Sequence, residues 1–528
     1  MLFALAIAFA IAHTQSPLYF SNQHQYFVHG LADGGMGSLD KDWLANTPDP
    51  TPAFSHFVAF THRYLNDWLV FQGVFFLLLC IYFLSLVSIA TLVISQGPSP
   101  RRAQLWIGIS LIVLHAGILR FASVKLFGVD YPWYFQCGVA NQYVLGTGLQ
   151  PSAFGVFLIT AVAAFAHGRP VLAIVCSSAA CLMHATYLLP AAMLTLGFMF
   201  ATWRQGRGRA ALLLGAGSLL LVLPAVIYSL LKFGPTSAEQ FHEAQRILVD
   251  VRIPHHSVIR RWFAPIDALQ IIWICLGIFL SRHSLLCPVM VIAAALALLL
   301  SFVQLATGNV ALALLFPWRI SSVLVPLATA VVFIFYLTVL AEELSFASRL
   351  TKIVFVILGV AVIGGIVIDI EGLGYGTNER EMPALEYVRD HKVPGNLYLI
   401  PVRVPTPSPG ARGTGSTTFM PPPGSNQPTL IAVDLQRFRL IAGAPIYVDF
   451  KSIPYKDVDV LEWRHRIEQC QKWYKAKDWG NPAKLAELRS AGITHVLIQA
   501  DQPIDAAGYV EVFADGYYRL YRMPKVSQ

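Results

Sequence analysis

Eleven apolar runs constrain this chain more than any other feature of its sequence. About 20 apolar residues are needed to cross the hydrocarbon core of a bilayer, and there only helices and closed barrels satisfy every backbone polar group. Only 13% of the residues are charged, against about 25% in soluble domains. We therefore expect a polytopic α-helical membrane protein with about eleven transmembrane helices. The runs lie near residues 1–14, 65–95, 104–127, 152–168, 170–187, 188–203, 209–232, 264–281, 284–307, 319–341 and 350–369.

The chain changes character near residue 372, where charged residues become frequent. The alternation of short β-like runs with helix-like segments predicts a soluble α/β domain over 372–528, after a membrane domain over 1–371. The segment 403–428 is rich in Pro, Gly, Ser and Thr and is expected to be a loop. The expected strands lie at 396–402, 430–435, 445–450, 495–500 and 509–513, and the expected helices at 381–391, 457–475 and 482–491.

The loops between the runs predict the orientation of the chain. Short loops that carry Arg or Lys alternate with longer loops, and the positive-inside rule places the short basic loops in the cytoplasm. The first long loop, 15–64, and the C-terminal domain then lie outside an inner membrane. The N-terminal run lacks a basic start and a small-residue cleavage site, so we expect a first span rather than a cleaved signal peptide.

Acidic residues gather in the first long loop. Asp40 and Asp42 form a D-x-D triplet, which can supply a general base or ligands for a divalent cation. Helix capping and turn formation explain these two residues equally well, and turns explain Asp33 and Asp49 better. Asp130, beside several aromatic residues in another outer loop, is the second acidic candidate.

Several arginines depart from the positive-inside rule because they lie in the outer loops. Arginine beside aromatic residues at a membrane interface can bind a lipid phosphate, although anchoring and snorkelling are the alternatives. Adjacent histidines point in different directions on a helix or strand and make a poor metal pair by themselves. The candidate substrate-binding residues are Arg252, His255, His256, Arg260, Trp318 and Arg319.

Several motifs are missing from the sequence. It contains no phosphate-binding P-loop, no G-x-S-x-G elbow, no H-E-x-x-H and no paired C-x-x-C, which argues against an ATPase, a serine hydrolase and a zinc protease. The net charge is +8, but no basic face with interleaved aromatic residues is present, so we expect no nucleic-acid partner.

The many spans, the acidic first outer loop and the C-terminal outer domain together resemble the GT-C superfamily of membrane glycosyltransferases. This resemblance implies a GT-C-like fold and a sugar donor carried on a polyprenyl phosphate. It implies a catalytic acid at Asp40 or Asp42, a second acid at Asp130, and a carrier-phosphate contact at Arg319 or at Arg252 and Arg260. The adjacent acidic pair of many members is missing, so the choice among Asp33, Asp40 and Asp42 stays open.

The functional hypothesis is therefore a glycosyltransferase on the outer face of the membrane, with a glycan, lipid or protein acceptor. A lipid-linked glycan polymerase or ligase is the first alternative, and longer products would indicate it. A transporter is the second, although the inverted repeats typical of that class are missing. A membrane scaffold is the third, because the charged and aromatic segment 447–466 is a suitable binding surface. That segment and others also resemble uncharacterised multi-spanning bacterial membrane proteins.

Overall fold

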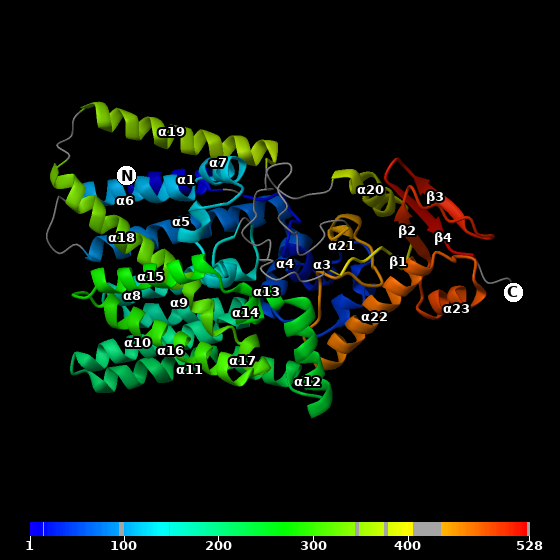
Figure 1. Cartoon of the computed structure of the whole chain (residues 1–528), viewed down its shortest axis with the longest axis horizontal. Helices are drawn as coiled ribbons and strands as arrows, with labels where there is room; N and C mark the ends of the chain where they lie inside the picture. The colour runs from blue at the N-terminus through cyan, green and yellow to red at the C-terminus, as the bar shows by residue number, and fades with distance from the viewer. Residues whose placement is uncertain are drawn as a thin grey trace.

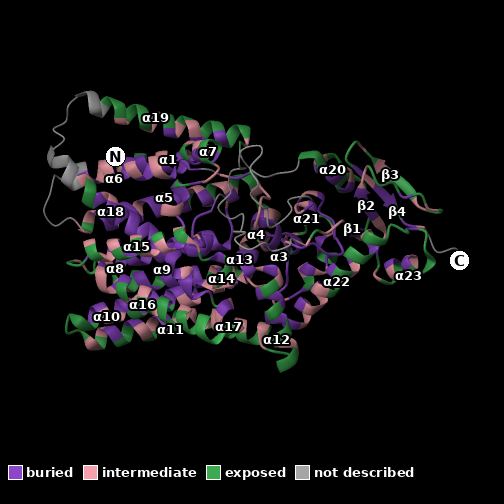
Figure 2. Ribbon diagram, in the orientation of Figure 1, coloured by how far each residue is buried: buried purple, intermediate pink, exposed green. Residues whose placement is uncertain are grey.

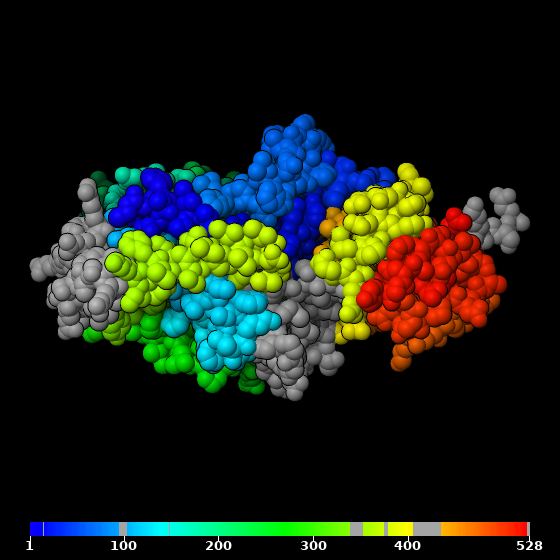
Figure 3. All heavy atoms as spheres, turned by 90° about the horizontal axis from the view of Figure 1, so that it is seen from above, coloured from blue at the N-terminus to red at the C-terminus, as the bar shows by residue number. Residues whose placement is uncertain are grey.

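The computed structural model describes residues 1–13, 15–93, 100–146, 148–343, 348–373, 379–404 and 435–524. A bundle of apolar helices forms one end of an elongated molecule and a small domain with a β-sheet forms the other (Figure 1). Seen from above, the C-terminal domain again stands at one end of the molecule, beyond the helices (Figure 3).

A helix lies within each apolar run of the membrane domain. Among the described residues, six helical stretches are long and apolar enough to cross a membrane, and five shorter apolar helices accompany them. The number of eleven spans stays a prediction. The helices are α1 (Leu2–Ala12), α5 (Asp67–Val93), α6 (Pro100–His115), α7 (Gly117–Phe127), α8 (Val156–Ala166), α9 (Pro170–Met183), α10 (Leu188–Arg204), α11 (Gly208–Phe233), α15 (Pro265–Leu280), α16 (Leu286–Thr307), α18 (Ser321–Glu343) and α19 (Ser348–Glu371).

The outer faces of these helices are apolar and exposed. Green residues cover much of α19 and α11 in Figure 2, and large hydrophobic side chains such as Leu213, Leu230 and Val356 are among the exposed ones. Water-soluble proteins rarely expose contiguous apolar surface of this extent, so these faces are suited to lipid.

Two helix breaks follow from the local sequence. The run 104–127 breaks at Ala116, whose backbone is extended, and the boundary between α9 and α10 lies at His184, also extended. Pro190 lies in the first turn of α10. A proline is tolerated there because its missing N–H would have no helical partner.

Short helices gather between the bundle and the C-terminal domain. Loop one forms α2 (Gln23–Tyr26), α3 (Val28–Gly34), η1 (Leu39–Lys41), η2 (Leu44–Asn46) and α4 (Pro52–Tyr64). The 234–264 segment forms α12 (Ala238–Arg246), the π-helix η7 (Ile247–Arg252), α13 (Pro254–Ser257) and α14 (Ile259–Trp262). The remaining short helices are η3 (Pro132–Phe135), η4 (Val139–Asn141), η5 (Pro151–Gly155), η6 (Ala185–Tyr187), α17 (Val310–Leu314) and η8 (Pro317–Ile320).

The C-terminal domain combines a four-stranded sheet with helices. Strand order is β1-β2-β4-β3, with β1 parallel to β2 and the other pairs antiparallel. The strands are β1 (Tyr398–Leu399), β2 (His495–Gln499), β3 (Val510–Ala514) and β4 (Tyr518–Arg522). The helices are η9 (Glu379–Glu381), α20 (Met382–His391), α21 (Phe438–Ala442), α22 (Asp457–Ala476) and α23 (Pro482–Ser490).

The expected helices of this domain are present, but two strand expectations are wrong. The segment 445–450 makes only an isolated bridge, between Ile446 and Tyr398, because its backbone and side chains also bond to loop one and α21. The strand β4 was missed, because its alternating arginines and tyrosines do not form an apolar run. The expected strand 430–435 and the expected loop 403–428 lie largely outside the described residues.

The C-terminal domain is joined to loop one by close contacts. Ser38 donates its backbone N–H to the Gly443 carbonyl at 2.9 Å. Gly37 has φ +56°, and a Cβ there would lie 2.2 Å from that carbonyl oxygen, so only glycine fits this approach. Helix α12 packs on α22, and Ala244 of α12 and Trp463 of α22 belong to one apolar core.

Candidate functional site

Three cationic side chains from distant parts of the chain meet where the bundle joins the C-terminal domain. Arg252 ends the π-helix η7, Arg319 belongs to η8, and Lys451 follows the segment 445–450. The His256 ring interacts electrostatically with all three, so they surround one small region. We call Arg252, Arg319 and Lys451 the cationic cluster.

Arg252 is buried in this cluster. One guanidinium nitrogen donates to the Lys451 backbone carbonyl, and the guanidinium carbon lies 5.6 Å from the centre of the Phe450 ring. Its Nε is buried and has no hydrogen-bond partner among the described residues. A buried donor without a partner costs free energy, so this N–H is available to an anionic ligand.

Arg319 is arranged in a similar way. Its guanidinium carbon lies 5.0 Å from the centre of the Tyr187 ring, and its Nε is likewise buried without a partner in the described part of the chain. The preceding Trp318 donates its indole N–H to the His256 carbonyl at 3.1 Å, which ties η8 to α13. Two separate guanidinium N–H groups of the cluster are thus unused.

The two histidines lie against the cluster as neutral rings. The His255 and His256 ring centres are 4.2 Å apart, and His256 Nδ1 bonds to the Ala140 carbonyl at 3.0 Å. Burial, helped by the nearby cations, lowers the pKa of His256 to about 3 and that of His255 well below its usual value. His256 donates its one N–H to the Ala140 carbonyl, which leaves its Nε2 as an acceptor, and the neutral His255 ring has one N–H donor.

An outer loop of the bundle sets the position of His256. Ala140 has an unusual left-handed backbone with φ +57°, and its N–H donates to Asp267 Oδ1 at 3.0 Å. The other carboxylate oxygen of Asp267 accepts the Ala264 N–H at 2.8 Å. Asp267 therefore holds the turn whose carbonyl bonds to His256.

Lys451 is the cation whose charge is most sensitive to its surroundings. Burial and the nearby Arg252 lower its pKa to about 7, opposed by Asp449. Asp449 itself forms a buried ion pair with Arg439, and Arg439 Nε donates to Asp42 at 2.8 Å. This Asp42–Arg439–Asp449 triad fixes the turn that carries Lys451, because Asp449 also accepts the Ser452 N–H at 2.6 Å.

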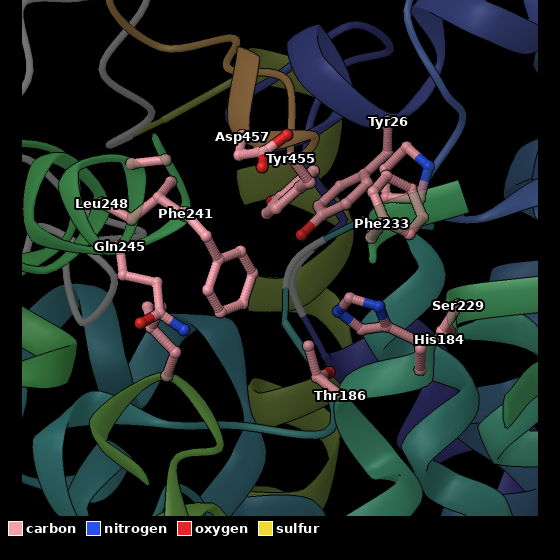
Figure 4. A pocket seen from close by; sticks show the side chains of 14 residues that line it. Tyr26, His184, Thr186, Ser229, Phe233, Phe241, Gln245, Leu248, Tyr455 and Asp457 are labelled. Atoms are coloured by element: carbon pink, nitrogen blue, oxygen red, sulfur yellow. The ribbon is translucent and has the colours of Figure 1, made fainter. Parts of the chain in front are cut away.

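A largely apolar chamber of about 310 Å³ is lined by residues from loop one, α12 and the C-terminal domain (Figure 4). Tyr26 lines it and also interacts electrostatically with Arg252 and Arg319, and Tyr455 lines it and interacts with Arg252. Burial raises the pKa of Tyr26 well above its usual value, so this phenol stays neutral. The other lining residues are Pro50, His184, Ala185, Thr186, Ser229, Phe233, Phe241, Ala244, Gln245, Leu248, Leu314 and Asp457.

Comparisons with known proteins were made for the whole chain. A family model described as a domain of unknown function (DUF6798) matches residues 425–470, and no curated protein matches. The archaeal oligosaccharyltransferase AglB from Archaeoglobus fulgidus, solved with an inhibitory peptide and a dolichol-phosphate, is 12% identical. The match has a TM-score of 0.46 and covers 95% of this chain and 69% of the AglB chain. ArnT from Cupriavidus metallidurans, solved bound to undecaprenyl phosphate, is 11% identical with a TM-score of 0.36, over 98% and 96% of the two chains.

The chain is similar to these two membrane proteins in overall structure only. At these identities and TM-scores the similarity assigns no role to any residue. The DUF6798 match includes Arg439, Asp449 and Lys451, so it covers the turn that completes the cluster.

The structure brings together most of the basic residues proposed from the sequence. Arg252, His255, His256, Trp318 and Arg319 all belong to the cluster or contact it. Arg260 is exposed on α14.

The acidic candidates do not meet in one place. Asp42 is fully buried and bonds to Arg439, Leu44 N–H and Ile446 N–H. Asp40 is exposed and pairs with Lys41 at 2.9 Å. Asp130 forms a buried ion pair with Arg120 at 2.8 Å. The geometry gives Asp42 and Asp130 clear structural roles, whereas Asp33 and Asp40 are both exposed.

The metal prediction is not tested by this arrangement. No group of three His, Cys, Asp or Glu side chains among the described residues is placed to hold a metal ion. The side chains of Asp40 and Asp42 turn to different partners, Lys41 and Arg439, so the D-x-D triplet does not present two carboxylates to one cation here.

Sequence reasoning missed Lys451, Tyr26 and Tyr455 as site residues. Lys451 and Tyr455 lie in the segment 447–466, which the sequence marked only as a suitable binding surface. Tyr26 sits in loop one among more conspicuous acidic residues. A signal for Lys451 existed in its position, between the apolar run that ends at Phe450 and the Ile453-Pro454 that follows.

Proposed function

We propose that this protein is a membrane glycosyltransferase that takes a sugar from a polyprenyl-phosphate-linked donor on the outer face of the membrane. The observation that carries the proposal is the cationic cluster, in which Arg252 is buried, Arg319 and Lys451 are partly buried, and both arginines have a buried Nε–H without a partner among the described residues. The proposal includes eleven spans, a cell (inner) membrane location and an extracytoplasmic C-terminal domain.

The physics of burial favours a phosphate at this place. Taking a guanidinium out of water costs several kcal/mol unless an anion and hydrogen bonds compensate. Arginine presents planar N–H groups that suit phosphate oxygens, and such charge-assisted bonds are about twice as strong as neutral ones. A phosphate bound by both arginines would pair each unused Nε–H.

The chamber suits the apolar part of such a donor. Its walls are mainly apolar and aromatic, as in most small-molecule sites, and Tyr26 and Tyr455 both line it and interact electrostatically with Arg252. We assign the phosphate to the cluster and the adjoining isoprenyl units to the chamber. Both moieties of an amphiphile are then bound next to each other.

In the reaction, the cluster would stabilise the negative charge that develops on the departing phosphate. Donors fixed in a buried site stabilise such charge without reorganisation, which is often the largest single contribution to catalysis. The acceptor hydroxyl must also lose a proton to a base within hydrogen-bond reach. Asp40 is the loop-one carboxylate that we would test for this role, because its side chain is exposed.

The first test compares two arginines of the same outer segment, Arg252 and Arg261. Arg252→Gln removes a buried cation, whereas Arg261→Gln removes an exposed one. In lipid nanodiscs, we expect Arg252→Gln to weaken binding of radiolabelled undecaprenyl phosphate about 10- to 100-fold, with Arg261→Gln unchanged. Thermal unfolding of both variants checks that they are folded, and Arg252→Lys tests whether charge alone is sufficient.

A panel of radiolabelled polyprenyl-phosphate sugars then tests transfer. Arg252-dependent release or transfer of one sugar would support the enzyme class. If the unsubstituted protein binds no polyprenyl phosphate and turns over no donor in the panel, the proposed function is wrong.

A further inference from the structure

The corner between α4 and α5 exposes several large apolar side chains. The rings of Phe60 and Tyr64 contact each other there, with centres 5.2 Å apart. Scattered exposed apolar residues are ordinary in a protein, but a contiguous patch of them marks an interaction site. Five members are each more than half exposed, and we call them the corner patch: Phe60, Tyr64, Leu65, Trp68 and Leu69.

The other face of α4 packs on the protein. Helix α3 approaches it closely, because a Cβ at Gly30 would lie only 2.5 Å from the Ser55 carbonyl oxygen and 2.6 Å from the Val58 Cβ. The buried residues of α4 are Phe54, Ser55, Val58 and Thr61. Helix α4 is therefore held by one face, and the corner patch stays uncovered by the part of the chain that the structure describes.

The corner itself is fixed by polar contacts. Helix α4 ends at Leu65, whose backbone is extended. His62 Nδ1 then lies 2.6 Å from Asp67 Oδ2 at the start of α5, and the Tyr19 hydroxyl donates to the same carboxylate oxygen at 3.3 Å. These bonds hold α4 against the start of α5, so the corner patch has a defined position.

The corner patch continues the apolar surface of the bundle. Helix α5 is one of the stretches long and apolar enough to cross a membrane, and Leu69, Gly73 and Leu77 are exposed on it at a spacing of one helical turn. Helix α4 lies where the bundle meets the C-terminal domain (Figure 1). From above, the blue segment with α4 and the start of α5 projects from the side of the molecule at this level (Figure 3).

Helix α12 provides a contrast, because it also lies at this junction (Figure 1). Its exposed residues include Glu239, His242, Glu243 and Arg246, which suit water. Helix α4 contains no acidic residue, and large apolar side chains dominate its exposed face. The two short helices are therefore suited to different surroundings.

We propose that α4 lies on the membrane surface on the side of the C-terminal domain, with the corner patch inserted into the lipid of that leaflet. Tryptophan and tyrosine are enriched at the boundary between membrane and water. An interfacial helix of this kind buries its apolar face about 5–10 Å into the boundary between headgroups and acyl chains. The inference needs no sugar donor and is independent of the proposed function.

Lipid contact at α4 also bears on the rest of loop one. Helix α3 packs on α4, and the chain that follows α3 bonds to the C-terminal domain through Ser38 and Gly443. Tyr26, just before α3, lines the chamber. An inserted α4 therefore fixes the height of loop one, and of the chamber wall that it supplies, relative to the lipid headgroups.

The experiment places a bimane fluorophore on Tyr64→Cys in the corner patch and on Glu243→Cys in α12, the matched control. Both variants are studied as full chains in nanodiscs that hold one copy, and the unsubstituted chain with its seven free cysteines gives the background. A phosphatidylcholine with a nitroxide near its headgroup should quench the label at position 64 several-fold more than the label at 243. Aqueous iodide should show the reverse preference.

Equal quenching of both labels by iodide would place the corner patch in water and overturn the proposal. Protection of position 64 from both quenchers would show that protein covers the patch and would also overturn it; protection seen only in discs with two copies would assign the patch to a second copy. If Tyr64→Cys lowers the melting temperature, Phe60→Cys gives the same test. Binding of polyprenyl phosphate, measured separately, decides the proposed function.

Discussion

At the scale of single residues, Lys451 is the group whose charge is expected to change near neutral pH. Its pKa in the folded protein is lowered from 10.5 to about 7, first by burial and then by Arg252. The groups around it are Arg252, Arg403, Asp449, His24, His255 and His256. Because the unfolded chain binds this proton more tightly, Lys451 makes the free energy of unfolding rise with pH between about 7 and 10.5.

The affinity for an anion should instead fall as the pH rises. Only protonated Lys451 attracts a phosphate, so we predict that affinity for the methyl ester of undecaprenyl phosphate falls about tenfold from pH 6 to pH 8. Lys451→Arg should remove this dependence, because arginine stays charged. Equilibrium binding across this range measures it, and the same slope in Lys451→Arg would contradict the prediction.

Asp42 and Asp40 provide a matched pair for separating structure from catalysis. Asp42→Asn breaks a buried ion pair with Arg439, and removing one partner of such a pair typically costs about 3–5 kcal/mol. We predict a clear loss of thermal stability and of activity together. Asp40→Asn, at an exposed pair, should leave the melting temperature unchanged.

Sugar transfer distinguishes the roles of these two residues. If Asp40→Asn abolishes transfer while the protein stays folded and binds donor, Asp40 is the general base. If Asp42→Asn abolishes transfer at an unchanged melting temperature, our structural assignment of Asp42 is wrong.

At the scale of elements, α12 forms one wall of the chamber and connects the bundle to the C-terminal domain. Phe241, Ala244 and Gln245 line the chamber from this helix. The turn before α12 is tied to α22, because Asp457 accepts the Thr236 N–H at 2.6 Å and its hydroxyl at 2.7 Å. Helix α12 therefore lines the chamber and is also fixed to α22 of the C-terminal domain.

A substitution on each side of α12 tests the chamber. Ala244 is buried and faces the cavity, whereas Ala238 is exposed at the start of the same helix. We predict that Ala244→Phe fills part of the chamber and weakens undecaprenyl phosphate binding about tenfold. Ala238→Phe should have no effect on binding, measured by the same nanodisc assay.

Inorganic phosphate is the internal control for this comparison, since it has no isoprenyl chain to place in the chamber. Its competition with the lipid should be unchanged in Ala244→Phe. An equal loss of affinity for both ligands would show that the substitution disturbs the cluster itself, and the assignment of the isoprenyl units to the chamber would fail.

At the scale of the whole molecule, the site exists only because the bundle, loop one and the C-terminal domain meet at one junction (Figure 1). The proposed orientation places this junction outside the membrane and the short basic loops inside. We predict that Lys475→Cys in α22 reacts with a membrane-impermeant maleimide from outside intact cells. Gln205→Cys, after α10, should react only after permeabilisation.

Both positions are exposed in the fold, so burial does not limit the reaction. The unsubstituted chain, with its seven free cysteines, provides the background. The same labelling for both variants in intact cells would contradict the orientation.

The sequence alone determined the helical membrane architecture, because long apolar runs have few other ways to satisfy their backbone in lipid. It also indicated candidate binding residues, since cations in outer loops need a reason to be there, and these were Arg252, His255, His256, Arg260, Trp318 and Arg319. The strands β1, β2 and β3 were also predicted, because each lies in a short β-like run of the sequence.

Only the tertiary structure decided which charged residues share one environment. The pairing of Asp42 with Arg439, 397 residues apart, turned a catalytic candidate into a buried ion pair. The approach of Lys451 to Arg252 depends on the docking of the C-terminal domain. Charge, burial and pKa are properties of neighbours in space, and a local pattern contains no information about neighbours that come from distant segments.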